Sequence, residues 1–195
     1  LTERQNAVLE EIKKFIAIGT CYSDWQFYSK FVKSNDDVCY TVGVHPLYVA
    51  NEGDLNSIAK FLHDKKLVAI GEIGLDYHWV KDPGLRNLQK QWFIKQINFA
   101  NLHQKPISVH NREVFEDCLN ILKEHPPIYS GVMHCYSGSV ELLSEVLKLN
   151  MYIGLDGPLT FTNAKTPKEV CEKVPLDRLL LETDSPYLAP HPLRG

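Results

Sequence analysis

The sequence predicts an α/β fold whose parallel strands close into a (β/α)8 barrel of the TIM type. Seven short apolar runs recur along the chain, mostly separated by stretches whose apolar residues have helical spacing. This alternation is typical of βαβ units with parallel strands. The runs are continuously apolar, as expected for strands covered on both faces. Polar residues follow most runs, and a barrel gathers strand ends at one face, whereas an open sheet spreads them along a line.

The first part of the chain shows this alternation clearly. Residues 15–20 form a short apolar run next to a glycine, which predicts a buried strand. Apolar residues lie on one helical face over 25–32, and a second strand is expected over 38–44, where a proline follows it. Apolar positions over 55–62 predict another helix, and 67–73 is a third strand closed by glycines.

The rest of the chain continues in the same way. Residues 166–173 predict a short helix, with Thr166 as its N-cap and Pro167 at the first helical position. The remaining helices are expected over 85–103, 114–122 and 140–149, and the remaining strands over 106–110, 129–134, 151–155 and 179–183.

Composition limits the class of protein. The chain has 195 residues, 44% of them hydrophobic and 23% charged, which fits one globular domain over 1–195. No apolar stretch is long enough to span a bilayer. Five cysteines without CxxC spacing indicate reduced thiols, so we expect a cytoplasmic location and no membrane partner. With a net charge of −3, nucleic-acid contact by bulk electrostatics is excluded and would have to be local or carried by metal ions.

Imidazoles and carboxylates follow the expected strands. Glu72, His110, His134 and Asp184 each lie at the carboxyl end of a different apolar run. One histidine at a strand end is usually structural, and one aspartate is usually a helix cap. Four such groups at one barrel face suit a Zn²⁺ or Mn²⁺ site with nitrogen and oxygen ligands. Their spacings match no local metal signature, so only the fold can bring them together.

Five segments resemble, in order and spacing, the motifs of the TatD family of metal-dependent hydrolases. The resemblance covers the chain from about Phe15 onward, and residues 190–195 resemble the start of a further motif. It implies a (β/α)8 barrel, one or two divalent ions (Zn, Mn, Mg or Ni) and hydrolysis of DNA, commonly as a 3′-to-5′ exonuclease acting on single-stranded ends. The segments are Gly43-Val-His-Pro46, Gly71-Glu-Ile-Gly-Leu-Asp-Tyr77, Val109-His-Asn-Arg112, Met133-His-Cys-Tyr-Ser-Gly138 and Glu182-Thr-Asp-Ser-Pro-Tyr-Leu188.

The resemblance also implies a role for each matching residue. Glu72 matches the carboxylate that bridges the metal ions, and His110 and His134 match ligands at strand ends. Asp184 matches an aspartate that binds metal and takes the proton of the attacking water. The remaining two are substrate-binding residues: His45 matches a histidine near the substrate phosphate, and Arg112 follows a ligand strand and could pair with a phosphate.

The chain departs from the family at both ends. Most members begin with a strand ending in His-x-His, a spacing that this sequence lacks, and they continue with a helix after the last strand. A full barrel of this kind needs about 250 residues. We therefore expect a barrel trimmed at both ends, without its first strand and its last helix. The sequence does not indicate the oligomeric state.

Several residues near strand ends have two interpretations. An aromatic side chain there can stack on an unpaired base or pack the loop; this applies to Tyr77, Trp79, Tyr136 and Tyr187. Asp76 can orient a ligand histidine or cap a turn. Cys135 neighbours His134, so strand alternation predicts that it faces outward and binds no metal.

Two further functions compete with the nuclease. A related metallohydrolase could cleave another ester or an amide, for example in D-aminoacyl-tRNA deacylation, because one fold hosts many chemistries. A barrel that has lost its metal could instead act as a binding module. The presence of all four candidate ligands argues against this last hypothesis.

Overall fold

The computed structural model describes residues 13–193, and seven parallel strands form its sheet. Each strand pairs with its neighbours in chain order, so the hydrogen-bonded order is β1-β2-β3-β4-β5-β6-β7. The last two residues of the 190–195 segment lie outside the described part. The strands are β1 (Phe15–Ala17), β2 (Val38–Val42), β3 (Leu67–Asp76), β4 (Ile107–Arg112), β5 (Gly131–Met133), β6 (Met151–Leu155) and β7 (Leu179–Leu181).

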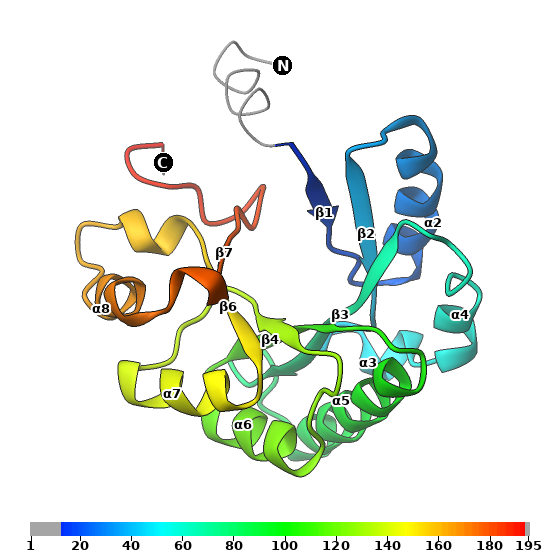
Figure 1. The fold of residues 1–195 in the computed structure, drawn as a ribbon. Helices are drawn as coiled ribbons and strands as arrows, with labels where there is room; N and C mark the ends of the chain where they lie inside the picture. The colour runs from blue at the N-terminus through cyan, green and yellow to red at the C-terminus, as the bar shows by residue number, and fades with distance from the viewer. Residues whose placement is uncertain (1–12, 194–195) are drawn as a thin grey trace.

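Helices cover the outer face of the sheet (Figure 1). The α-helices are α2 (Tyr22–Phe31), α3 (Val49–Glu52), α4 (Leu55–Ala59), α5 (Pro83–Leu102), α6 (Phe115–Glu124), α7 (Val140–Lys148) and α8 (Thr166–Lys173). The structure also has three short 3-10 helices within the described residues, which are η1 (Val32–Ser34), η2 (Gly157–Thr160) and η3 (Leu176–Arg178). None of the helices within 13–193 has both the length and the apolar character that a membrane crossing requires.

The sheet curls into an open barrel. Figure 1 shows the strands arranged along an arc, with β1 and β7 as its two edges. Within residues 13–193 these two edges do not pair with each other. The prediction of a TIM-type barrel with parallel strands is confirmed, with seven strands in a curled sheet.

The core lies between the strands and the outer helices. Trp25 of α2 and Phe93 and Ile97 of α5 are buried against the sheet, and β3 is almost continuously buried along its length. Burial on both faces explains why the strands have apolar runs without alternation.

Two buried glutamines of α5 hold the ends of neighbouring strands. Gln96 accepts a hydrogen bond from the Val44 backbone N–H at 2.7 Å and donates to the Val44 carbonyl at 3.1 Å. Gln89 accepts from the Asp76 N–H at 3.1 Å and donates to the Pro46 carbonyl at 3.1 Å. Because a buried amide left without a partner is costly, α5 fixes the backbone on either side of His45 and at Asp76.

The structure corrects some local predictions. β3 extends to Asp76, so Glu72 lies inside this strand rather than at its end. Glu72 falls where the register with β4 shifts, between Ile70 and Ile73. The N-cap of α8 is Lys165, and Thr166 is already helical, so the predicted Thr166 cap was wrong by one residue. The short helix α3 was not predicted, since four residues are too few to show periodicity.

Candidate metal centre

The curled sheet brings the five predicted imidazoles and carboxylates together. Glu72 projects from β3 and His110 from β4, whereas His134 follows β5 directly. His45 and Asp184 lie three residues beyond the ends of β2 and β7. The four candidate ligands therefore form one cluster on the carboxyl-end side of the strands, although 24 to 50 positions separate each from the next along the chain.

Glu72 occupies the centre of this cluster. Its Oε1 lies 2.7 Å from Nδ1 of His110. The same oxygen lies 4.0 Å from Nε2 of His45 and 4.0 Å from Nε2 of His134. The side chain is only 10% exposed. One buried carboxylate oxygen is thus shared by three imidazoles, a position suited to an anionic ligand.

A second carboxylate holds the other nitrogen of His110. Nε2 of His110 lies 3.1 Å from Oδ2 of Asp76, and Oδ1 of Asp76 accepts from the Trp79 backbone N–H at 2.8 Å. Asp76 therefore both orients the imidazole and caps a turn, which unites the two interpretations left open by the sequence.

His134 is held in the same manner. Its Nε2 lies 3.2 Å from Oδ1 of Asp184, and its Nδ1 lies 3.1 Å from Oε2 of Glu182. Glu182 also accepts the Cys135 backbone N–H at 2.9 Å. Its carboxylate fills the space beside Gly154, where a Cβ would lie 2.1 Å from Oε2.

Sequence reasoning missed Glu182. A signal was present, because Glu182 lies two residues before Asp184 and alternation places such a pair on one face of an extended chain.

Burial and charge set the protonation of these groups. Burial opposes the charged form of Glu72, but the hydrogen bond from His110 and the neighbouring imidazoles outweigh it and lower its pKa to about 2. Burial likewise opposes protonation of His110, yet Asp76 and Glu72 raise its pKa to about 9. For His134, Asp184 and Glu182 outweigh burial and raise the pKa to about 11. The carboxylates therefore attract positive charge to this cavity.

His45 differs from the other two imidazoles. Burial is the main influence on it and lowers its pKa to about 4, so it is neutral. Its Nδ1 accepts the Leu47 backbone N–H at 3.2 Å, which places the proton on Nε2, facing Glu72. His45 can thus donate a hydrogen bond into the cavity.

The donor set fits a divalent cation. Ligand atoms of His45, Glu72 and His110 all lie within 4.8 Å of one another. His134 lies 4.0 Å from Glu72, and Asp184 in turn lies 3.2 Å from the same His134 nitrogen. Imidazole and carboxylate together suit Zn²⁺ or Mn²⁺, and the excess of carboxylates needs a cation for balance.

Cys135 does not follow the alternation that was predicted for it. β5 ends at Met133, and Cys135 adopts a left-handed backbone conformation (φ 45°), so its direction is not that of a strand residue. Burial and the nearby carboxylate of Asp156 raise the pKa of its thiol. A thiol that stays protonated is a poor metal ligand.

The aromatic residues near the strand ends divide into two groups. Tyr136 is buried and donates to the Ser139 carbonyl, and Tyr77 is half-buried and donates to Asp117 at 2.8 Å. These two pack the loops. Trp79 and Tyr187 are exposed.

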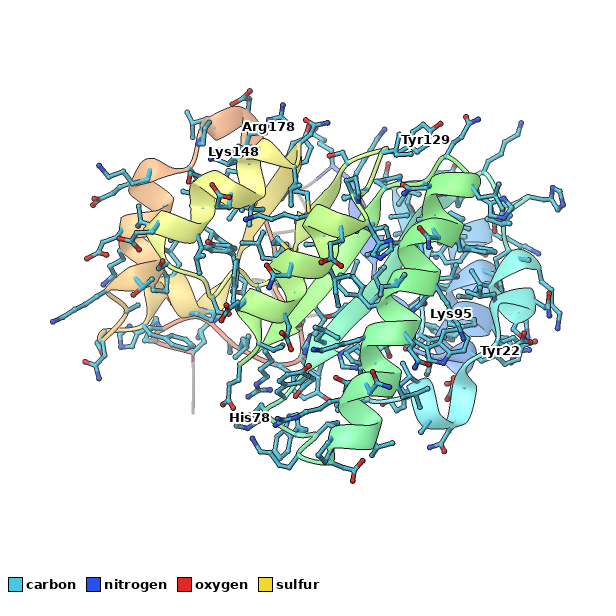
Figure 2. The ribbon with its side chains drawn as sticks, turned by 90° about the horizontal axis from the view of Figure 1, so that it is seen from below. Tyr22, His78, Lys95, Tyr129, Lys148 and Arg178 are labelled. Carbon is cyan, nitrogen blue, oxygen red and sulfur yellow. The ribbon has the colours of Figure 1, made fainter. Side chains whose placement is uncertain are left out.

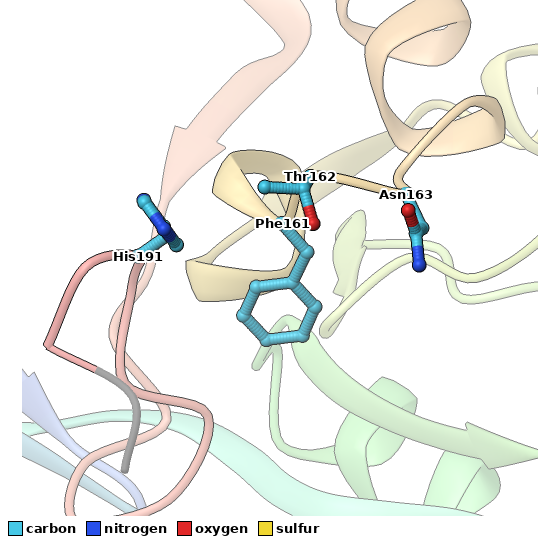
Figure 3. Close-up of a pocket in the computed structure, with 4 residues that line it drawn as sticks. All are labelled: Phe161, Thr162, Asn163 and His191. Atoms are coloured by element: carbon cyan, nitrogen blue, oxygen red, sulfur yellow. The ribbon is translucent and has the colours of Figure 1, made fainter.

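A pocket of about 390 Å³ opens beyond β6 and β7. Figure 3 shows Phe161, Thr162 and Asn163 on the segment after β6 and His191 on the C-terminal segment. The His191 backbone N–H donates to the Thr160 hydroxyl at 2.8 Å, which joins the two segments. The pocket lies on the same side of the sheet as the metal centre, because both segments follow the carboxyl ends of their strands.

Comparisons with known proteins agree with this geometry. The family model described as TatD related DNase matches residues 2–195. The chain is 41% identical over 194 residues to the uncharacterized metal-dependent hydrolase YabD of Bacillus subtilis, covering 98% of this chain and 75% of YabD. The human 3′-5′ RNA nuclease TATDN2 is 35% identical over 153 residues, covering 76% of this chain and 20% of TATDN2. The crystal structure of YJJV, a TatD homologue from Escherichia coli, superposes with a TM-score of 0.89 at 27% identity, covering 98% and 77% of the two chains.

Proposed function

The chain belongs to the family of TatD-related DNases, and from this premise we propose that it is a divalent-metal-dependent hydrolase that cleaves the phosphodiester bonds of DNA at single-stranded ends, in the 3′-to-5′ direction. The observation that carries the proposal is the position of Glu72, buried among His45, His110 and His134. A phosphodiester is an anion that repels hydroxide, so its hydrolysis needs both positive charge and a nucleophile available at neutral pH.

In this proposal Glu72, His110, His134 and Asp184 hold one or two divalent ions. Such ions, when bound, neutralise the phosphate and lower the pKa of water toward about 7. Asp76 and Glu182 receive the outer N–H of His110 and His134 and thereby fix which nitrogen faces the cavity.

Asp184 takes the proton of the attacking water. Its side chain is 31% exposed, compared with 10% for Glu72. A carboxylate that reaches both the cavity and solvent can pass a proton onward, whereas the enclosed Glu72 cannot do so readily. The exposed position therefore supports the base role for Asp184.

His45 and Arg112 bind the substrate phosphate. Nε2–H of neutral His45 faces the cavity and can donate to a non-bridging oxygen. Arg112 lies at the end of β4, two residues beyond His110, so alternation places it on the same face nearer the cavity mouth. The Arg112 guanidinium supplies local positive charge to a chain whose net charge is −3, and neutral His45 adds a hydrogen bond.

RNA is the second candidate substrate, because TATDN2, a relative of this chain, is a 3′-5′ RNA nuclease. The chemistry at the scissile phosphate would be the same. D-aminoacyl-tRNA deacylation and a metal-free binding role compete with both nuclease activities.

The first experiment compares substrates and metals on one preparation. Metal-stripped protein is supplied with Mn²⁺, Zn²⁺, Mg²⁺ or Ni²⁺ and assayed on single-stranded DNA, single-stranded RNA and D-aminoacyl-tRNA. We expect nucleotides to be released from DNA only after metal addition, and a labelled 5′ end to be retained to the last. Metal-dependent release of the amino acid alone would replace the nuclease with a deacylase. If the protein neither binds metal nor turns over any of the three substrates, that result would support a metal-free binding module.

Glu182→Gln tests the support of His134. Glutamine keeps the size that fits beside Gly154, but it replaces a charged acceptor for the His134 N–H with a neutral amide. We expect the affinity for Mn²⁺ to fall by about 10- to 100-fold, measured by calorimetric titration of the metal-stripped protein. The control Glu172→Gln, on the exposed face of α8, should leave the affinity unchanged. Equal affinities in both variants would remove Glu182 from the site.

A further inference from the structure

Trp79 presents a large apolar surface beside the metal centre. It lies in the loop between β3 and α5, on the side of the sheet where the candidate ligands gather. As a residue, Trp79 is 64% exposed, whereas the other two tryptophans, Trp25 and Trp92, are 0% and 9% exposed. The loop is at the margin of the molecule, as the neighbouring His78 shows in Figure 2. The exposed indole is therefore available to a ligand on this side of the sheet.

The backbone of Trp79 is tied to the metal centre through one carboxylate. Oδ1 of Asp76 accepts the Trp79 N–H at 2.8 Å, and Oδ2 of the same side chain contacts Nε2 of His110 at 3.1 Å. The Asp76 backbone N–H is itself held by buried Gln89. The Trp79 backbone is therefore held in place by Asp76, the same side chain that contacts the candidate ligand His110.

Arg112 accompanies the indole. Its guanidinium lies 5.7 Å from the centre of the Trp79 ring, and its carbonyl accepts the Tyr77 N–H at 3.0 Å. Within the described part of the chain, no carboxylate pairs with this guanidinium. The carboxylate of the next residue, Glu113, is already paired with His78 at 2.6 Å and lies 3.6 Å from Lys81. Arg112 is thus a free cation beside an exposed ring.

The indole also has lateral support. The His78 ring meets it edge to face, with centroids 4.7 Å apart and an interplanar angle of 88°. A ring held by its backbone, a guanidinium and an edge contact loses less freedom on binding than one on a mobile side chain.

We propose that Trp79 and Arg112 form a subsite for one nucleotide of a single-stranded nucleic acid, with the base stacked on Trp79 and an adjoining phosphate paired with Arg112. The proposal rests on the proposed nuclease function and adds the element that selects unpaired substrate. A base inside a duplex has both faces covered by its neighbours, so a base other than the terminal one must be unpaired to stack on this ring. DNA and RNA share the required chemistry.

Intrinsic fluorescence tests binding without turnover. Since Trp25 and Trp92 are enclosed, Trp79 is the tryptophan that a ligand can reach. We expect oligothymidylate and oligouridylate with phosphorothioate links to quench the emission of the full chain, and Trp79→Phe to lose this quenching. Quenching by only one of the two shows which of these two nucleic acids the subsite accepts. No quenching by either, or equal quenching in Trp79→Phe, would overturn the proposal.

Abasic substrates test the base contact kinetically. Trp79→Ala should lower kcat/KM on single-stranded substrate by about tenfold, and Trp79→Phe should restore most of it. A tetrahydrofuran residue, which lacks a base, is placed in turn at each of the terminal positions of the substrate. At one of these positions wild type and Trp79→Ala should have the same kcat/KM. The control Phe27→Ala removes a similarly exposed ring (60%) from α2 and should have no effect. An equal loss on every abasic substrate would show a structural effect and contradict the stacking role.

Salt dependence tests the phosphate contact. Arg112→Gln should weaken oligonucleotide binding and reduce the slope of log affinity against log salt concentration by about 0.7, the value for one neutralised phosphate of a single strand. An unchanged slope would contradict the assignment of Arg112. Quenching by oligonucleotides without any hydrolysis would support the subsite and contradict the nuclease function. Hydrolysis at the same rate in wild type and Trp79→Ala would support the nuclease function and contradict the subsite.

Discussion

Replacing Glu72 with glutamine is expected to reduce metal-dependent hydrolysis by about a thousandfold or more, because the contribution of a bound metal to catalysis amounts to several kcal/mol. The Glu72 carboxylate is the group that His45, His110 and His134 share. Glutamine has nearly the same shape, but it lacks the negative charge that offsets the positive charge of an ion. The measurement is kcat/KM on single-stranded DNA over a range of Mn²⁺ concentrations, together with calorimetric Mn²⁺ affinity.

Folding should survive this change. His110 can release the proton that Glu72 favours, so the substitution leaves no trapped buried charge, unlike the loss of a partner from a buried arginine. Circular dichroism and urea unfolding of the metal-free protein check this. Glu141→Gln, an exposed glutamate in the first turn of α7, removes the same charge away from the cavity and should leave activity unchanged. A folded Glu72→Gln protein with wild-type rates would rule out the central role of Glu72.

Asp184→Asn is expected to lower kcat by about 100- to 10,000-fold, the range of general-base contributions. The expected signature is a fall in kcat with little change in KM, since proton removal acts in the reaction rather than in substrate binding. Asparagine is chosen for a backbone reason. Asp184 has φ 50°, a left-handed conformation that asparagine tolerates and alanine does not, so Asp184→Ala would mix backbone strain with loss of the carboxylate.

The control for Asp184→Asn is Asp177→Asn, in the exposed η3 turn before β7. It removes an equal charge from the same part of the chain. Steady-state kinetics at saturating Mn²⁺ separate loss of the base from loss of the metal. If kcat of Asp184→Asn matches the control, another group must take the proton, and the exposure argument for Asp184 would be wrong.

The cluster has a consistent plan in which each of two imidazoles lies between two carboxylates. His110 lies between Glu72 and Asp76, and His134 lies between Asp184 and Glu182. The inner carboxylate of each pair faces the cavity, and the outer one faces the body of the protein. Such outer partners orient the ring and raise its basicity toward a metal, so their loss should weaken the site without removing a ligand.

The sequence alone predicted helices and strands well where the spacing of apolar residues indicates which positions are buried. The continuous apolar run at 67–73 indicated a strand covered on both faces, and the helical spacing over 85–103 indicated a long helix, observed as α5 at Pro83–Leu102. Both patterns arise because the residues of an element that face the core are apolar, so their spacing repeats the geometry of that element. The positions of His110, His134 and Asp184 near strand ends followed from the same patterns and from the resemblance to the TatD family.

Tertiary structure alone decided which of these groups touch, and how. Asp76 became a partner of His110 because β3 and β4 pair side by side, and Glu182 reaches His134 past Gly154 of the intervening strand β6. The backbone N–H of Leu47 set the tautomer of His45, and packing distinguished exposed Trp79 from buried Tyr136. Periodicity reports what surrounds a residue along its own element, whereas a contact between residues dozens of positions apart depends on the curvature of the whole sheet and on the helices packed against it.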